Sequence, residues 1–67
     1  MGRETIRTWQ GQIIGYLDHE SNGDITVRNF SGVILGRYVA REDMTKDFYG
    51  RNLYRGNMAA ALLVLNR

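Results

Sequence analysis

The chain has 67 residues and a formal net charge of +2, and it contains no cysteine, no proline and one histidine. A single domain spanning residues 1–67 buries little surface, so domains of this size usually depend on disulfides, a metal or association. The lack of cysteine excludes disulfides and thiolate metal sites, and one histidine excludes a histidine cluster. By elimination, a regular repeat or a homo-oligomer must stabilise the fold, and we expect no cofactor.

The composition is that of an ordinary folded domain, with 43% hydrophobic and 24% charged residues. The mildly basic balance permits an anionic partner such as nucleic acid without requiring one. The longest apolar run, residues 58–65, is much shorter than the roughly 20 residues of a membrane span, and no secretory signal is visible. We therefore expect a cytoplasmic protein.

Three segments, residues 6–16, 27–37 and 45–55, align without gaps. Each has a basic residue, an aromatic two positions later, a glycine two positions after that, and Ile or Leu three positions after the glycine. Such recurrence is typical of repeat architectures. Because the glycines lie between apolar runs and suit two-residue turns, we expect three β-hairpins at residues 5–18, 24–39 and 44–55. The predicted fold is a small sheet or barrel-like unit, with Asn22-Gly23 as the strongest turn signal.

Two-residue turns also predict the strand pairing. In the second hairpin they place Arg28 opposite Leu35, Asn29 opposite Ile34, and Gly36 opposite Val27. Alternation then predicts one face with Ile25, Val27, Ile34 and Tyr38, and an opposite face that carries the shared pattern together with Ile14, Leu35 and Leu53. In the third hairpin the face without the pattern is polar, so we expect it at an edge or facing water; it carries Thr45, Asp47, Asn52 and Tyr54.

A helix is predicted at residues 57–66, because Asn57 suits an N-cap and three alanines follow soon after it. The alternative of a last β-strand is disfavoured by those alanines. The predicted helix is apolar on all sides, which is typical of a helix covered on more than one side. We expect one side to pack on the sheet and another on a neighbouring subunit, with Met58, Leu62, Leu63 and Leu65 as interface candidates.

The shared pattern suggests a binding face. Aromatic rings beside cations can stack on bases while the cations neutralise phosphate; the candidates are Arg7, Trp9, Arg28, Phe30, Lys46 and Phe48. The favoured interpretation is instead that the aromatics fill a pseudo-symmetric core while the basic stems lie along it. A second basic set either binds an acidic or phosphate-bearing partner or pairs locally with Glu42, Asp43 and Asp47; it comprises Arg37, Arg41, Arg51, Arg55 and Arg67, with Tyr38, Tyr49 and Tyr54 between them.

No catalytic or metal-binding motif is present, and His19 is expected in an exposed turn beside Asp18 and Glu20. We therefore predict a protein that is not an enzyme.

Two resemblances bear on function. Residues 6–57 resemble small uncharacterised bacterial and phage proteins built from short hairpins, with segments such as Phe30-Ser31-Gly32-Val33-Ile34-Leu35-Gly36, and are similar in style to the β-flower repeat proteins. This resemblance implies a small phage- or prophage-borne protein that acts by binding. Residues 9–16 resemble a strand-turn-strand stretch of the type II dihydrofolate reductases, which are SH3-like barrels, although the Val-Gln-Ile-Tyr active-site strand of that family has no counterpart here.

The leading functional hypothesis is a small non-enzymatic binding or regulatory protein that acts as a homo-oligomer on a host component. The alternatives are nucleic-acid or nucleotide binding through the Arg and aromatic face, and a reductase-like enzyme with a central pore.

Overall fold

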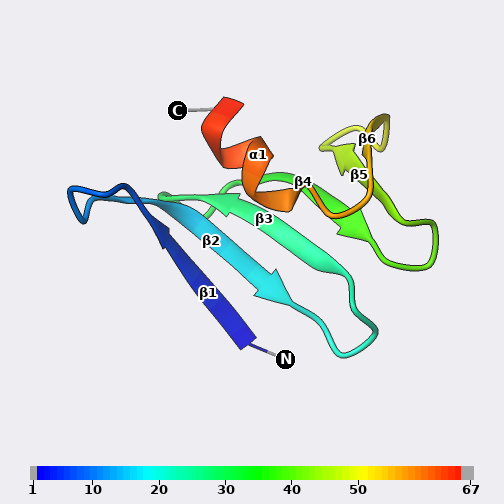
Figure 1. Cartoon of the computed structure of the whole chain (residues 1–67), viewed down its shortest axis with the longest axis horizontal. Helices are drawn as coiled ribbons and strands as arrows, with labels where there is room; N and C mark the ends of the chain where they lie inside the picture. The colour runs from blue at the N-terminus through cyan, green and yellow to red at the C-terminus, as the bar shows by residue number, and fades with distance from the viewer. Residues whose placement is uncertain (1, 66–67) are drawn as a thin grey trace.

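In the computed structural model, which describes residues 2–65, six antiparallel strands form one open sheet and a short helix follows them. The strands are β1 (Gly2–Arg7), β2 (Ile13–His19), β3 (Ile25–Asn29), β4 (Ile34–Val39), β5 (Met44–Asp47) and β6 (Asn52–Arg55), and the helix is α1 (Ala59–Leu65). Each strand pairs with the next one in the chain, so β1 and β6 are the edges (Figure 1). The prediction of a mainly β fold with a short C-terminal helix is confirmed.

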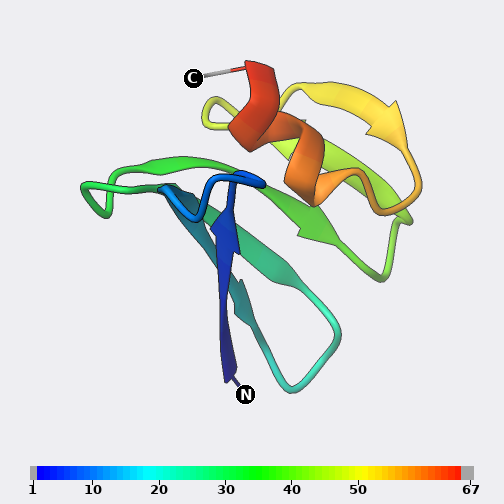
Figure 2. The ribbon, with the colours of Figure 1, turned by 60° about the vertical axis from the view of Figure 1, so that its left-hand side comes forward.

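The sheet is curved, and α1 lies on its hollow side against β2, β3 and β4 (Figure 2). Because the strands alternate in direction, the loops of β1–β2, β3–β4 and β5–β6 lie at one end of the sheet. We call this end the loop end and define it by residues 8–12, 29–33 and 47–51. The other two loops lie at the opposite end. No helix within residues 2–65 has the length and apolarity needed to cross a membrane.

The three loops of the loop end share one backbone pattern. The N–H of Gly11 donates to the carbonyl of Thr8 at 2.8 Å, and the equivalent bonds join Gly32 to Asn29 and Gly50 to Asp47. All three glycines have positive φ, between 85° and 90°. A further bond from the N–H of Thr8 to the carbonyl of Gln12 closes a loop of three residues, as it does in the other two. The predicted two-residue turns are therefore wrong by one residue.

A β-bulge follows each of these loops and restores the register. Arg28 pairs with Ile34 rather than with the predicted Leu35, yet Val27 pairs with Gly36 as predicted. The extra residue of the bulge, here Leu35, interrupts the strict alternation of side chains between the two faces of the strand. Leu35 packs against the core and Ile34 is exposed, which reverses the predicted faces of these two residues. The same register shift occurs in the first and third hairpins.

The core lies between the sheet and the helix. It contains Leu17, Ile25 and Val27 from the sheet and Ala59, Leu62 and Leu63 from the helix. Two glycines of the sheet, Gly15 and Gly36, form the floor beneath the leucines. A Cβ at Gly15 would overlap a methyl of Leu63 and the carbonyl oxygen of Arg28, and one at Gly36 would overlap the carbonyl oxygen of Lys46 and lie 2.9 Å from Leu62. Close approach of helix and strands therefore requires glycine at both positions.

The start of the helix is anchored to the third hairpin. The fully buried hydroxyl of Thr45 donates to the carbonyl of Gly56 at 2.8 Å and accepts from the N–H of Met58 at 2.9 Å. The side chain of Asn57 accepts from the N–H of Ala59 at 3.3 Å, which confirms its capping role. The third hairpin forms an edge of the sheet, which is one of the two places expected for its polar face, but Thr45 itself is buried because its hydroxyl bonds to backbone groups of Gly56 and Met58.

Part of the predicted subunit interface of α1 is buried within the chain. Leu62 and Leu63 are almost fully buried against the sheet of their own chain, so they are not available to a neighbouring subunit as predicted. Met58 is 45% exposed. The side chain of Leu65 and the predicted end of the helix at residue 66 lie outside the described part of the chain, as does Arg67 of the second basic set.

Candidate binding site at the loop end

The three aromatic residues of the shared pattern are exposed at the tips of the loops. Trp9 is 93% exposed, Phe30 68% and Phe48 63%. The prediction that they fill a core is wrong, because each ring lies in a loop just beyond the end of its strand and is mostly exposed. All three belong to loops at one end of the sheet, so the structure brings these predicted site residues to the same surface.

The residue before each aromatic shapes its loop, a role that the sequence pattern did not include. The side-chain oxygen of Thr8 accepts from the N–H of Gln12 at 3.2 Å, and Asn29 accepts in the same way from Val33 at 3.0 Å. Asp47 does the same for Arg51 at 2.9 Å. Thr, Asn and Asp are the residues that commonly fold loops through their own side chains, so this choice of residues was a usable signal.

The basic residues of the pattern support their own loops. A guanidinium nitrogen of Arg7 donates to the carbonyl of Gly11 at 3.1 Å, and one of Arg28 donates to that of Gly32 at 3.0 Å. Lys46 differs, since its ammonium lies 2.8 Å from a carboxylate oxygen of Glu42. These cations are therefore partly engaged within the chain, which reduces what they offer to a phosphate.

Arg28 also belongs to a small ion-pair network beside the sheet. Asp18 accepts from Arg3 at 2.7 Å and from Arg28 at 2.9 Å. The hydrogen bond from Arg3, reinforced by Arg28, holds the pKa of the Asp18 carboxyl below its usual range. Asp18 is therefore an anion that orients two arginines, and it has no free proton to exchange at neutral pH.

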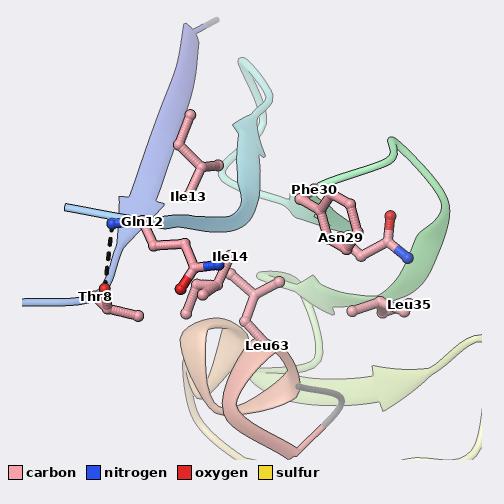
Figure 3. A pocket seen from close by; sticks show the side chains of 8 residues that line it. All are labelled: Thr8, Gln12, Ile13, Ile14, Asn29, Phe30, Leu35 and Leu63. Carbon is pink, nitrogen blue, oxygen red and sulfur yellow. Dashed lines mark hydrogen bonds between the residues drawn. The ribbon is translucent and has the colours of Figure 1, made fainter. Parts of the chain in front are cut away.

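A groove of about 240 Å³ opens between the first and second hairpins (Figure 3). Ile13 and Ile14 come from β2 on one side, and Phe30 and Leu35 come from the second hairpin on the other. Leu63 of α1 reaches the groove from the helix, as the close view shows. The polar rim is formed by Thr8, Gln12 and Asn29. The groove thus has an apolar lining with hydrogen-bonding groups near its edge.

A second groove of about 290 Å³ opens between the second and third hairpins. Its lining matches that of the first nearly position by position, with Ile34 and Leu35 in place of Ile13 and Ile14, and Phe48 in place of Phe30. The remaining lining residues are Asp47, Tyr49, Arg51, Leu53 and Leu62. Leu35 lines both grooves, so the two grooves adjoin at that side chain.

The second basic set is split: Arg51 and Tyr49 line the second groove, whereas other members lie elsewhere. Arg37 lies 3.0 Å from Asp24, a mostly buried residue beside the β2–β3 loop at the opposite end. A hydrogen bond from the N–H of Ala40, together with Arg37, lowers the pKa of Asp24. Tyr54 and Arg55 lie on the edge strand β6 and contribute to neither groove.

His19 and its acidic neighbours lie where β2 ends. His19 ends β2 rather than lying in a turn, and its exposed ring lies 3.1 Å from a carboxylate oxygen of Glu4. Within the described residues, no group of three or more His, Cys, Asp and Glu side chains could hold a metal ion. Comparisons of the chain with protein-family models, curated proteins and solved structures found no match.

Proposed function

We propose that this chain is a non-enzymatic binding protein whose loop end accepts apolar side chains of a protein partner. The observation that carries the proposal is the pair of adjoining apolar grooves, each with an exposed phenylalanine at its wall. Exposed aromatic and aliphatic side chains around a concave surface are typical of interaction sites. A host component as the target, and an origin in a phage or prophage, remain predictions from the resemblance.

The proposal includes a threefold hairpin repeat. Three features support it: the same loop bonds, the same bulge after each loop, and the matching linings of the two grooves. A repeat of this kind explains why two similar grooves form, because each groove requires two neighbouring hairpins. Three hairpins in a row therefore give two grooves.

Self-association is the second part of the proposal, and it depends on the exposed apolar residues in and next to α1. Met58 and Val64 are exposed there, whereas Leu62 and Leu63 face the sheet. Light scattering should give a mass above the 7.7 kDa of one chain, and Met58→Lys should lower it. A monomer at all concentrations for the unaltered protein would contradict this part.

Nucleic-acid binding is the second candidate function, favoured by one observation. Trp9 is the most exposed aromatic of the loop end, and its neighbour Arg7 has no carboxylate partner among residues 2–65. Stacking of a base on Trp9 would give binding that weakens with salt and is lost in Trp9→Ser. Titration of a labelled single-stranded oligonucleotide at two salt concentrations tests nucleic-acid binding. An assay of NADPH oxidation with dihydrofolate tests the reductase alternative.

Selection of random displayed peptides on the immobilised protein tests the leading proposal. We expect enriched sequences with apolar or aromatic residues, whose binding is lost in the double variant with Phe30→Ser and Phe48→Ser. Trp9→Ser is the matched control, since Trp9 is an exposed aromatic at the equivalent loop position that lines neither groove. Failure to enrich any peptide, or equal binding by the double variant, would overturn the proposal.

A further inference from the structure

We infer that the partner segment is an α-helix with acidic flanks that places two apolar side chains, seven residues apart, into the two grooves. The inference rests on the proposed function and specifies the conformation, spacing and charge of what binds. It follows from the distance between the grooves, from the residue that they share, and from the charge of the loop end.

The spacing comes from the sheet. The lining of the first groove extends from β2 to β4 and is centred on β3, and that of the second extends from β4 to β6 and is centred on β5. Two steps between neighbouring strands separate these places, which is about 10 Å. One bound segment must therefore present two anchoring side chains about that far apart.

A helix meets this requirement and an extended strand does not. Seven residues of α-helix rise by about 10.5 Å and complete almost two turns, so residues i and i+7 lie on the same face. An extended segment covers the same distance in about three residues, and side chains three apart in a strand point to opposite faces. The separation of the grooves thus selects a helix over a strand.

The residue between the grooves fits the same geometry. Leu35 contributes to both linings and lies between Phe30 and Phe48 along the loop end. A helix anchored at i and i+7 turns its residues i+3 and i+4 toward the same surface. A third apolar side chain at one of these positions would therefore contact Leu35, and the binding face would have an i, i+4, i+7 pattern.

The charge of the loop end indicates acidic flanks. The loops and the strand residues next to them carry four cationic residues, Arg7, Arg28, Lys46 and Arg51, and one acidic residue, Asp47. Arg28, Lys46 and Arg51 each have an intrachain carboxylate partner, so the positive field is moderate. Acidic residues on the partner would strengthen binding and accelerate association, with an effect that weakens as salt is added.

Four synthetic peptides of identical length test the inference, with binding measured by chemical-shift changes of the ¹⁵N-labelled full chain. The first is a helix with Leu at i, i+4 and i+7 and Glu elsewhere on its flanks. The second has the same composition with the last Leu moved to i+5, which turns it away from the face. The third replaces Glu by Lys, and the fourth keeps the anchors but contains proline to prevent the helix.

We expect the first peptide to bind at least about tenfold more tightly than the second and fourth, since an unplaced leucine loses most of its burial. The third should bind more weakly than the first at low salt, and the difference should shrink at high salt. Phe30→Ser and Phe48→Ser should each weaken the first peptide about tenfold, while Trp9→Ser should leave it within about twofold.

Three results would overturn the inference, and the first two differ from those that would overturn the proposed function. Equal or tighter binding of the proline peptide shows that the partner is extended, and equal binding of the i+5 peptide shows that the spacing does not matter. In both cases the grooves still bind apolar side chains. Absence of binding by all four peptides overturns the helix inference, and the displayed-peptide selection then decides the proposed function separately.

Discussion

The first two hairpins and the third share one loop but differ in what packs upon them. In the first hairpin Arg7 pairs with Ile13, and Gly15 lies two positions after Ile13. Gly36 holds the matching position in the second hairpin, and both glycines lie beneath leucines of α1. The third hairpin has Tyr54 there. The shared pattern therefore sets the loop, and the residue at this further position decides what can approach the strand.

This difference distinguishes the edge strand β6 from β2 and β4. A Cβ at Gly15 or Gly36 would overlap a backbone oxygen of the next hairpin, Arg28 or Lys46 respectively. Tyr54 carries a Cβ and a large ring, so another hairpin could not pack against β6 in the same manner. The chain instead turns at Gly56 and forms the helix that covers the two glycine-containing hairpins.

The largest expected effect comes from removing the leucines that cover the glycines. Leu62→Ala and Leu63→Ala should each lower the free energy of unfolding by about 3 kcal/mol, because each empties a buried site. Thermal unfolding followed by circular dichroism measures this. Val64→Ala on the exposed side of the same helix is the control and should change stability by less than about 0.5 kcal/mol. Equal effects at Leu62 and Val64 would contradict the packing described.

The next effect tests the glycines themselves. Gly15→Ala and Gly36→Ala should each cost about 2 kcal/mol, since the new methyl group forces apart the helix and the neighbouring strand. Gly2→Ala is the matched control, because nothing lies within 4 Å of a Cβ at that strand glycine. Urea unfolding of the three variants measures the difference. If Gly36→Ala were as stable as Gly2→Ala, the close approach of helix and sheet would not exist.

A smaller effect concerns the hydrogen bonds that join the third hairpin to the start of the helix. Thr45→Val keeps the shape of the side chain but removes the hydroxyl that serves Gly56 and Met58, and it should cost about 1–2 kcal/mol. The exposed Thr5, also in a strand, is the control for Thr-to-Val replacement. Urea unfolding again measures the difference, and a neutral Thr45→Val would show that the helix start is held by Asn57 alone.

The sequence predicted the elements well because the pattern is local. Glycines after apolar runs indicated the hairpins, and Asn57 before three alanines indicated the helix. The predicted strand pairing next to the loops is wrong by one residue. Loop length depends on the φ of a single glycine and on a bulge, and neither changes the hydrophobic pattern. Thr8, Asn29 and Asp47 carried the missing signal, since their side chains close the longer loop.

The candidate site was predictable in its aromatics but not in its grooves. Phe30 and Phe48 stood out by their spacing, yet a linear pattern does not show where the covering helix stops. The grooves combine residues of two hairpins with a helix residue such as Leu63, and this combination depends on long-range packing. The sequence leaves two roles open for the arginines of the pattern, a contact with a ligand or a stem along the core, because their bonds to loop carbonyls, as at Arg28, are visible only in three dimensions.

The smallest expected effect compares the acids that precede the second and third hairpins. Asp24 and Glu42 hold matching places, and the pKa of each is lowered, by the N–H of Ala40 at Asp24 and by Lys46 at Glu42. A carboxyl whose pKa is lower in the folded state stabilises the fold above its ordinary pKa, and this contribution is lost as the pH falls.

We therefore expect the urea midpoint of the unaltered protein to fall as the pH is lowered from about 5 through the ordinary aspartate pKa near 3.9. Asp24→Asn should flatten this fall more than Glu42→Gln does, because Asp24 is mostly buried and bonded to the backbone whereas Glu42 is exposed. Some slope should persist in both variants, since Asp18 and Asp47 also have lowered pKa values. Equal slopes for the two variants would show that burial and the bond to Ala40 add nothing beyond a surface ion pair, and the second hairpin would then be no better anchored than the third.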